Sequence, residues 1–403
     1  MTVNIKPSKV KGKVTAPSSK SMSHRLLICA GLSKGESEIK NIIYSEDILA
    51  TIDCLKAMGA GIEISDDTVK IVGTSPSKSV GTVYNCRESG STLRFFIPLA
   101  MLGEGESLFK GYGRLMERPM EVYEKISKEN NIPYSKTDEG IKVGGGLISG
   151  KFTVPGNISS QFVSGLLFAL PLCSGDSEIE LTDKIESKSY IDMTLKAMSL
   201  FGVEAAWKNE TTLFIKGNQQ YKSRDLTVEG DYSNAAFLDA FNFMGGDVKV
   251  EGLDEVSLQG DSIYKEYFEA LKQGAPVLDI GNCPDLAPIL MTVAAANNGC
   301  KLINTARLKI KESDRGVVMA QELSKFGADI LVKDNEIIIN EAELYIPKDD
   351  LYCHNDHRVV MSLSVLASVY GGRLLGAEAV KKSFPDFFNK VKALGMEVEL
   401  NDN

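Results

Sequence analysis

The sequence predicts an α/β protein of two domains, and three observations support this prediction. With 403 residues, the chain is too long for one ordinary hydrophobic core. Six times, a segment with helical periodicity stops at Gly or Asn and is followed by a short apolar run of strand length. No low-complexity segment or long linker interrupts this alternation of helices and strands, which is typical of α/β proteins.

The six stops mark the repeated unit. They are Gly59, Asn131, Gly202, Gly274, Gly327 and Gly395, at spacings of 72, 71, 72, 53 and 68 residues. Gly and Asn best adopt the left-handed conformation of a helix C-terminal cap. Glycine is common after any helix, but the recurring strands favour a repeat, and we expect three units in each domain.

Each unit also contains an earlier helix that is apolar over most of its surface and is therefore expected to be buried. These helices have polar starts near Ser21, Ser89, Ser159, Ser233, Asp285 and Asp356. Strands are expected at 68–72, 212–215 and 336–339. Residues 3–14 resemble one strand without a helix of its own and are candidates to join the second domain. We therefore expect domains of residues 18–228 and of residues 1–17 with 229–403.

Composition and charge exclude several classes of protein. The sequence has 45 Lys and Arg against 54 Asp and Glu, with no basic run, so nucleic acid is not expected as a partner. Seven scattered cysteines without CxxC pairs and only three histidines predict reduced thiols, a cytoplasmic location and no metal site. No signal peptide or membrane span is expected, because no apolar run is long enough.

The most densely charged motif is Lys311-Glu312-Ser313-Asp314-Arg315, which opens directly into a helical pattern. Unpaired backbone N–H groups and the helix dipole favour anions at such a start, and two cations strengthen the attraction. The carboxyl group of Glu312 would lie among these cations, where it could donate or accept a proton. A solvated helix start with local ion pairs is the alternative for this motif alone.

Other predicted helix starts also contain cationic or polar residues. Cations stand there at Lys20, Arg25, Arg94, Arg118, Lys188, Arg358 and Lys382. Hydroxyl, amide or small residues stand there at Gly90, Ser159, Ser160, Gln161, Ser187 and Tyr190. Ordinary N-capping explains each serine taken alone. So many cations in an acidic protein predict a pocket for small anions that carry phosphate and carboxylate groups.

Asp285 follows Pro284 and precedes an apolar helix. It is either an N-cap carboxylate or a base that takes a proton from a substrate hydroxyl. His24 and His357 are expected to pack between helices and receive no role in proton transfer. No GxxxxGK[ST] or GxGxxG motif follows a strand, so neither an ATP site nor a dinucleotide site is expected.

Six motifs follow one another along nearly the whole chain, from about Lys6 to Asp386. They are Lys20–Arg25 (KSMSHR), Ser89–Arg94 (SGSTLR), Ser159–Phe162 (SSQF), Lys311–Arg315 (KESDR), Asn355–Arg358 (NDHR) and Lys382–Asp386 (KSFPD). As a set they resemble the 3-phosphoshikimate 1-carboxyvinyltransferases, also called 5-enolpyruvylshikimate-3-phosphate (EPSP) synthases. The resemblance implies an inside-out α/β barrel of two domains, each of three βαβαββ units with pseudo-threefold symmetry, joined by a double chain crossover.

The resemblance also implies a reaction. The enolpyruvyl group of phosphoenolpyruvate would pass to the 5-hydroxyl of shikimate 3-phosphate by addition and elimination, with release of phosphate and without a cofactor or metal. Shikimate 3-phosphate would bind Lys20, Ser21, Arg25, Ser159, Ser160, Gln161, Ser187, Tyr190, Asp285 and Lys311. Phosphoenolpyruvate would bind Lys20, Gly90, Arg118, Gln161, Arg315, Arg358 and Lys382. Asp285 would accept the hydroxyl proton, Glu312 would protonate the methylene carbon, and Lys20 completes the candidate catalytic set. We expect a monomer.

Two positions depart from the family pattern. Glu88 stands where many relatives have Asn, and Arg307 stands where some have an Asn near the sugar-like ring. Two alternatives stay open. The sister transferase that acts on UDP-N-acetylglucosamine would be expected to have a reactive cysteine near Arg118, and residues 105–118 contain none. A non-catalytic anion-binding protein would not need both Asp285 and Glu312.

Overall fold

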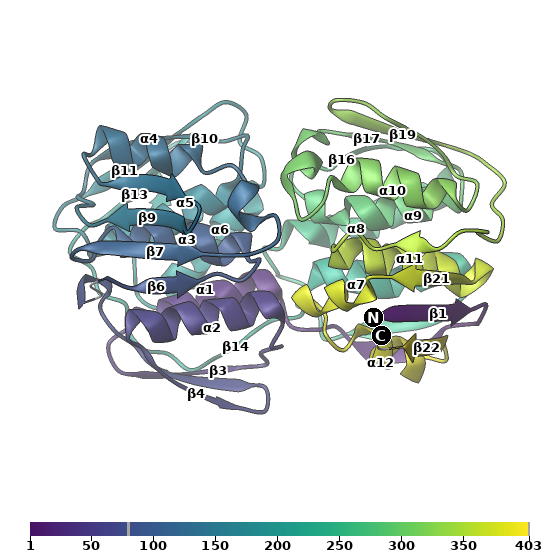
Figure 1. The fold of residues 1–403 in the computed structure, drawn as a ribbon, viewed down its shortest axis with the longest axis horizontal. Coiled ribbons are helices and arrows are strands. Elements are labelled where there is room, and N and C mark those ends of the chain that lie inside the picture. Colours follow the sequence, from purple (N-terminus) through teal and green to yellow (C-terminus); the bar gives the residue numbers. More distant parts are fainter. Residues whose placement is uncertain (79–80, 402–403) are drawn as a thin grey trace. The chain divides into compact units, whose positions relative to one another are not determined.

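The computed structural model of the protein describes residues 1–78 and 81–401. The chain divides into two compact units, which are described separately (Figure 1). Ser18–Glu229 forms one, here the N-terminal unit. Met1–Pro17 and Gly230–Asn403 together form the other, the C-terminal unit. The chain therefore starts in the C-terminal unit, leaves it after Pro17 and returns at Gly230.

Three sheets of four strands make up the N-terminal unit within residues 18–78 and 81–229. The strands are β3 (Glu36–Lys40), β4 (Gly61–Ser65), β5 (Thr68–Val72), β6 (Val83–Asn85), β7 (Glu106–Lys110), β8 (Tyr134–Thr137), β9 (Gly140–Gly144), β10 (Lys151–Pro155), β11 (Ser177–Thr182), β12 (Ala205–Trp207), β13 (Thr212–Ile215) and β14 (Leu226–Thr227). The helices are α1 (Lys20–Gly31), α2 (Glu46–Met58), α3 (Gly90–Ala100), α4 (Glu121–Glu129), α5 (Ser160–Ala169) and α6 (Lys188–Leu200). The sheet orders are β14-β3-β5-β4, β6-β7-β9-β8 and β10-β11-β13-β12.

The second of these sheets shows the repeated unit in full. The order β6-α3-β7-α4-β8-β9 is a βαβαββ unit, in which β6 and β7 are parallel and β9 runs antiparallel to both β7 and β8. The strands bury alternate residues, such as Ser107 and Phe109 of β7. Helices α3 and α5 are buried over nearly their whole length. The helices therefore lie inside and the sheets outside, which confirms the predicted inside-out α/β fold (Figure 1).

The C-terminal unit repeats this plan within residues 1–17 and 230–401. Its strands are β1 (Thr2–Lys6), β2 (Lys11–Thr15), β15 (Asp247–Glu251), β16 (Val277–Asp279), β17 (Cys300–Ile303), β18 (Asp329–Val332), β19 (Glu336–Asn340), β20 (Leu351–Tyr352), β21 (Gly372–Leu375) and β22 (Glu397–Asn401). Its helices are α7 (Tyr232–Asp239), α8 (Tyr264–Gln273), α9 (Ala287–Ala295), α10 (Arg315–Ser324), α11 (His357–Tyr370) and α12 (Phe387–Ala393). The sheet orders are β16-β17-β19-β18, β20-β21-β1-β22 and β15-β2.

Two expectations about this unit are wrong. Residues 3–14 form two strands rather than one, because Pro7 lacks a backbone donor and β1 ends at Lys6. Strand β1 pairs with β21 and β22, and β2 pairs with β15 in another sheet. The fourth repeat is also incomplete, since the strand after Gly274 is β16, which begins the next sheet. The short spacing of 53 residues after Gly274 reflects this missing hairpin.

The predicted helix boundaries agree with the structure at most positions. All six stops have positive φ, although Gly274 at 157° is nearly extended. Gly59 is itself a left-handed C-cap, with φ 106°. Ser89, Ser159 and Asp356 are N-caps whose side chains accept backbone N–H groups.

Three helix starts differ from the expectation. Asp285 is not an N-cap, because it lies in a 3₁₀ turn, Pro284–Leu286, that precedes α9. Arg118 follows another 3₁₀ turn, Leu115–Glu117, and α4 begins only at Glu121. Helix α6 begins at Lys188, five residues before the expected start at Met193.

Each unit has its own apolar core. One core cluster extends from Met22 to Val228, and the other joins Val3 of the first strand to residues as late as Met396. All seven cysteines are buried free thiols, as predicted. No helix in residues 1–78 or 81–401 is long and apolar enough to cross a membrane.

Candidate active site

In the C-terminal unit, Asp285 is the centre of an ion-pair cluster. Its Oδ1 atom lies 2.7 Å from Arg315 Nη1 and 3.2 Å from Lys311 Nζ. Its Oδ2 atom lies 2.9 Å from Arg358 Nη2. These three cations come from the loop before α10, from the first turn of α10 and from the first turn of α11. The cations predicted at two separate helix starts, those of α10 and α11, therefore converge on one carboxylate.

Arg315 binds two further carboxylates. Its Nη2 atom donates to Glu312 Oε2 at 2.6 Å, and its Nε atom donates to Asp356 Oδ2 at 2.8 Å. The Arg315 side chain is only 1 % exposed. Burial opposes the charge, but Asp356, Glu312 and Asp285 outweigh it and raise the pKa of Arg315 above its ordinary value. Arg315 is therefore a fixed positive charge at the base of the cluster.

Lys311 differs from Arg315 because it remains partly accessible. Its side chain is 28 % exposed. Desolvation lowers the pKa of Lys311, and the positive charges of Arg315 and Arg307 add to this, whereas Asp285 opposes it. An anion at Lys311 would relieve this positive environment, so the position suits a phosphate group.

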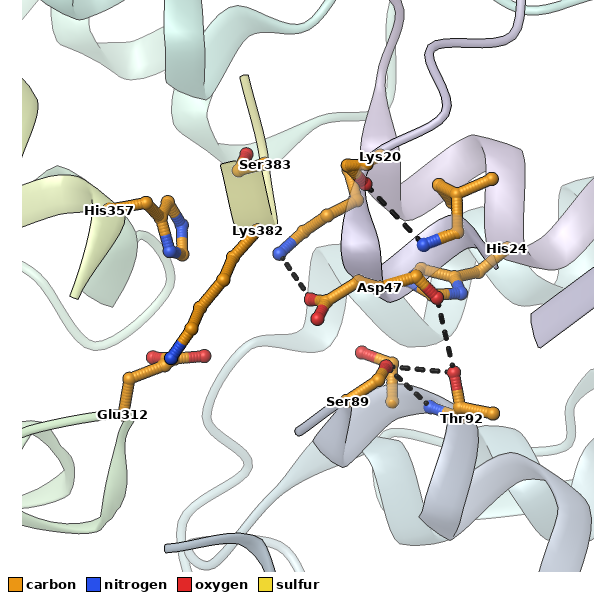
Figure 2. A network of polar contacts seen from close by, with 12 residues as sticks. Lys20, His24, Asp47, Ser89, Thr92, Glu312, His357, Lys382 and Ser383 are labelled. Carbon is orange, nitrogen blue, oxygen red and sulfur yellow. Dashed lines mark hydrogen bonds and ion pairs between the residues drawn. The ribbon is translucent and has the colours of Figure 1, made fainter. Parts of the chain in front are cut away.

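Lys382 and Arg358 complete the cluster. Lys382 Nζ donates to the carbonyl oxygen of Asn355 at 2.8 Å, and in Figure 2 its side chain points toward the carboxylate of Glu312. Arg358 Nη1 donates to Ser233 Oγ at 2.6 Å. The cluster thus contains four cations and three carboxylates, and Arg307 adds a further positive charge near Lys311. The four cations are Lys311, Arg315, Arg358 and Lys382, and the carboxylates are Asp285, Glu312 and Asp356.

In the N-terminal unit, Lys20 pairs with Asp47. The Nζ atom of Lys20, the first residue of α1, lies 2.8 Å from Oδ2 of Asp47 in the first turn of α2 (Figure 2). Both side chains are mostly buried, with exposed fractions of 15 % and 11 %. Thr92 Oγ1 also contacts the Asp47 carbonyl oxygen at 3.4 Å and Ser89 Oγ at 2.8 Å. Polar contacts therefore connect the starts of α2 and α3, and Lys20 joins α1 to them.

Gly90 and Arg118 lie against each other. A Cβ atom added at Gly90 would meet Nη1 of Arg118 at 2.5 Å, so only glycine leaves room for this guanidinium. Arg94 lies beside them, one turn along α3, and its Nη1 atom donates to Gln161 Oε1 at 2.7 Å. Gln161 Nε2 in turn donates to Ser91 Oγ at 2.9 Å. Three residues predicted to bind phosphoenolpyruvate therefore share one part of this unit.

Arg25 organises a second group in the same unit. Its Nη2 atom donates to the carbonyl oxygen of Tyr190 at 2.9 Å, and its guanidinium lies 5.8 Å from the Tyr190 ring centroid. Burial lowers the pKa of Arg25 to about 10. Ser21 lies one turn before Arg25 and accepts from it through its carbonyl oxygen. Ser187 is buried and left-handed, with φ 56°, directly before α6.

The two serines at the start of α5 have different structural roles. Ser159 Oγ accepts from the backbone N–H of Gln161 at 3.3 Å, so the N-cap explanation holds for this residue. Ser160 is the first residue of the helix and is 8 % exposed. Both stand beside Gln161, so the start of α5 gathers three of the predicted side chains.

Comparisons with known proteins identify the family of this chain. A family model described as EPSP synthase (3-phosphoshikimate 1-carboxyvinyltransferase) matches residues 5–391. The chain belongs to the EPSP synthase family. A 3-phosphoshikimate 1-carboxyvinyltransferase of Clostridium kluyveri is 42 % identical over 420 residues, covering 98 % of each chain. The one of Clostridioides difficile is 39 % identical over 432 residues, covering 99 % of this chain and 98 % of the relative.

Solved EPSP synthase structures have the same fold. An EPSP synthase from Acinetobacter baumannii has a TM-score of 0.80 and 24 % sequence identity, with complete coverage of both chains. A second structure of that enzyme has a TM-score of 0.79 at 23 % identity. At this level of identity, these structures support the fold.

The two departures from the EPSP synthase pattern lie in different units. The carboxylate of Glu88 lies against Gly113, where an added Cβ atom would clash with it. Arg307 is 8 % exposed, and its Nη2 atom donates to the carbonyl oxygen of Gly281 at 2.8 Å. Neither side chain is simply solvated at the surface.

The sequence does not predict several contacts of this candidate site. Asp47 has no signal of its own, and Ser233 and Asp356 are predicted only as polar helix starts. Asp356 is both an N-cap and an ion-pair partner of Arg315, and only the first role has a local sequence signal. His24 packs as predicted, with Nδ1 2.7 Å from Thr51 Oγ1. Among the described residues, no three His, Cys, Asp or Glu side chains are grouped to hold a metal.

Proposed function

We propose that this chain transfers the enolpyruvyl group of phosphoenolpyruvate to the 5-hydroxyl of shikimate 3-phosphate and releases phosphate. Membership of the EPSP synthase family supports the reaction. The observation that carries the assignment of residues is the cluster in which Lys311, Arg315 and Arg358 surround Asp285. Such a cluster suits substrates that carry both phosphate and carboxylate groups. The buried free thiols support a reducing, cytoplasmic location.

Each unit supplies part of the binding residues in this proposal. For phosphoenolpyruvate, Arg315, Arg358 and Lys382 act from the C-terminal unit, and Lys20, Gly90, Arg118 and Gln161 from the N-terminal unit. For shikimate 3-phosphate, Asp285 and Lys311 act from the C-terminal unit, and Lys20, Ser21, Arg25, Ser159, Ser160, Gln161, Ser187 and Tyr190 from the N-terminal unit. Guanidinium groups bind carboxylates and phosphates in a bidentate fork, which fixes the orientation of the ligand.

The first chemical step is an addition. The 5-hydroxyl oxygen forms a bond to C2 of phosphoenolpyruvate while Asp285 takes the hydroxyl proton and Glu312 delivers a proton to the methylene carbon C3. In the second step, the bond between C2 and the phosphate oxygen breaks. The Glu312 carboxylate takes a proton back from C3 as phosphate departs, the enol ether double bond forms, and the proton held by Asp285 passes to the departing phosphate. Lys20 stabilises negative charge on the phosphate during both steps.

Arg315 connects the two proton transfers. In the structure its guanidinium contacts both Asp285 and Glu312, and such contacts favour the ionised carboxylates. A substrate anion that binds Arg315 competes with these carboxylates for the same N–H groups. Binding therefore weakens the hold on Glu312, which can then carry the proton it donates, and weakens the hold on Asp285, which becomes a better base.

The test is a phosphate-release assay on the whole chain. With phosphoenolpyruvate and shikimate 3-phosphate we expect phosphate release, and with phosphoenolpyruvate and UDP-N-acetylglucosamine we expect none. Asp285→Asn and Lys311→Ala should abolish or strongly reduce release. Release with the UDP sugar alone would support the sister transferase, and no release with either acceptor would support a binding protein.

A further inference from the structure

The turn between β20 and α11 is held in an uncommon conformation. His354 and Asn355 have φ values of 49° and 53°, in the left-handed region that residues with side chains rarely adopt. Such residues persist only where the surroundings hold them, and they gather at functional sites. The residue that follows this turn is Asp356, the ion-pair partner of Arg315.

The carboxylate of Glu322 contacts this turn and the strand before it. Its Oε1 atom lies 3.0 Å from His354 Nε2, and its Oε2 atom accepts from the backbone N–H of Tyr352 at 2.8 Å. Lys325 Nζ donates to the same Oε2 atom at 2.6 Å. The Glu322 side chain is only 3 % exposed. Burial opposes its charge, but the bonds from His354, Lys325 and Tyr352 outweigh this and lower the pKa of Glu322.

The same turn also contains groups that bind residues of the ion-pair cluster around Asp285. The carbonyl oxygen of Asn355 accepts from Lys382 Nζ at 2.8 Å. The carboxylate of Asp356 accepts from Arg315 Nε at 2.8 Å and from the backbone N–H of Arg358 at 2.9 Å. The turn therefore binds the side chains of Lys382 and Arg315 and caps the backbone at Arg358, and all three residues are proposed to bind phosphoenolpyruvate. In these hydrogen bonds Glu322 contacts the turn and the strand before it rather than the three cations, and it shares helix α10 with Arg315.

The N-terminal unit contains a turn of the same design. Arg87 has a φ of 50° and follows the buried Cys86, as His354 follows the buried Cys353. Arg87 and His354 each lie two positions before the N-cap of the next helix, which is Ser89 in this unit and Asp356 in the other, where Asn355 is left-handed as well.

An acidic residue eight positions after a helix N-cap binds each of the two turns. Asp53 follows Ser45 by eight residues and lies 2.8 Å from Arg87, and Glu322 follows Asp314 by the same number. Glu46 adds a second contact to Arg87 at 2.6 Å. The contact between an acidic helix residue and the turn thus recurs in two repeats with different residue types. This recurrence indicates that the contact stabilises the turn and is not a chance ion pair.

We propose that Glu322 is a positioning residue for phosphoenolpyruvate, acting through the turn at 353–356 on Lys382, Arg315 and Arg358, and that Asp53 is its counterpart for the turn that carries Gly90. The inference rests on the proposed function, because it concerns how that substrate is bound. Glu322 touches neither substrate in this account. It fixes the distances between the cations that do.

The test separates the two substrates. Glu322→Ala should raise the KM for phosphoenolpyruvate by roughly 10- to 100-fold, the scale expected when a remote change misplaces binding groups. The KM for shikimate 3-phosphate should rise much less, because most of its proposed contacts lie in the N-terminal unit. Glu322→Gln should recover most of the affinity, since an amide oxygen still accepts from the N–H of Tyr352.

A matched control separates positioning from stability. Asp239 is a largely buried carboxylate of the same unit that accepts from the Tyr264 hydroxyl, and its pKa is raised by burial. Asp239→Ala should lower the unfolding temperature without changing either KM. If Glu322→Ala behaves like this control, or raises both KM values equally, Glu322 is not a positioning residue.

A second variant keeps the proposal testable if Glu322→Ala does not fold. His354 is 30 % exposed, so His354→Ala should fold, and it removes one of the two bonds between Glu322 and the turn. We expect a smaller rise in the KM for phosphoenolpyruvate, and an unchanged KM in His354→Ala would overturn the proposal even if Glu322→Ala is unfolded. The wild-type chain is assayed beside the variants. If it releases no phosphate, the proposed function fails, whereas wild-type release with unaffected variants refutes only the positioning role.

Discussion

Arg315 Nη2 lies 2.6 Å from Oε2 of Glu312, the residue proposed to protonate the substrate. The same guanidinium lies 2.7 Å from Asp285, the residue proposed to remove a proton. One buried cation thus contacts both the proposed acid and the proposed base. In the proposed function, a substrate carboxylate that takes up this cation would free both residues at once and would link substrate binding to proton transfer.

Glu312→Gln should retain substrate binding and lose most turnover. An amide can still accept the hydrogen bond from Arg315, but it cannot deliver a proton, so we expect kcat to fall roughly 10²–10⁴-fold. Steady-state kinetics with both substrates would measure this, and the KM values should stay close to those of the wild type. A variant with unchanged kcat would remove Glu312 from the mechanism.

Arg315→Leu should destabilise the C-terminal unit by about 3–5 kcal/mol, as expected when one partner of a buried pair is removed. The reason is Asp356, whose side chain has no exposed surface and would lose its cation. Urea unfolding measures the change in the free energy of unfolding. Lys311→Leu is the control, because its partly exposed side chain should matter much less. Equal effects of the two substitutions would contradict the assigned difference in burial.

Gly90→Ala should weaken phosphoenolpyruvate binding while it barely affects stability. The new Cβ atom would displace the guanidinium of Arg118, which is the end of a flexible side chain and can move. Helix α3 itself loses nothing, since Ala has the higher helix propensity. The measurements are the KM for phosphoenolpyruvate and the unfolding temperature of the variant. A large drop in unfolding temperature with unchanged KM would mean that the contact is structural.

Lys311 should set an alkaline limit on the use of shikimate 3-phosphate. Its pKa is lowered from the ordinary value of 10.5, so its positive charge is present at lower pH and is lost as pH rises through this lowered pKa. The kcat/KM for shikimate 3-phosphate should therefore fall in the alkaline range before an ordinary lysine would titrate. In Lys311→Arg this fall should move to higher pH, because arginine stays charged. An unchanged pH profile would assign the limit to another group.

The sequence predicts much of this fold because its helix boundaries have local causes. Ser89, Ser159 and Asp356 bond to backbone groups two or three residues away, so their pattern is visible in the chain itself. The strand at 3–14 was harder to predict. Its apolar residues gave no sign that the two halves belong to different sheets, and Pro7 was the one local hint of a break.

The sequence predicts the cations of the candidate site but not the carboxylates that pair with them. Lys20 and Arg315 stand out at helix starts, but Asp47 lies 27 residues from Lys20, and Asp356 lies 41 residues from Arg315. Glu322 looks like an ordinary charge on a helix until the fold brings residues 352 and 354 against it. Pairings of this kind depend on tertiary packing, which hydrophobic periodicity does not encode.

The place of β1 inside the sheet β20-β21-β1-β22 affects how the molecule can be made. Strand β1 pairs with residues 372–375 and 397–401, which are synthesised only after the whole N-terminal unit. The N-terminal unit is continuous in sequence and can fold while translation continues. Strand β1 must therefore wait without these partners while more than one unit is made, and its unpaired edges are open to wrong pairing during that time.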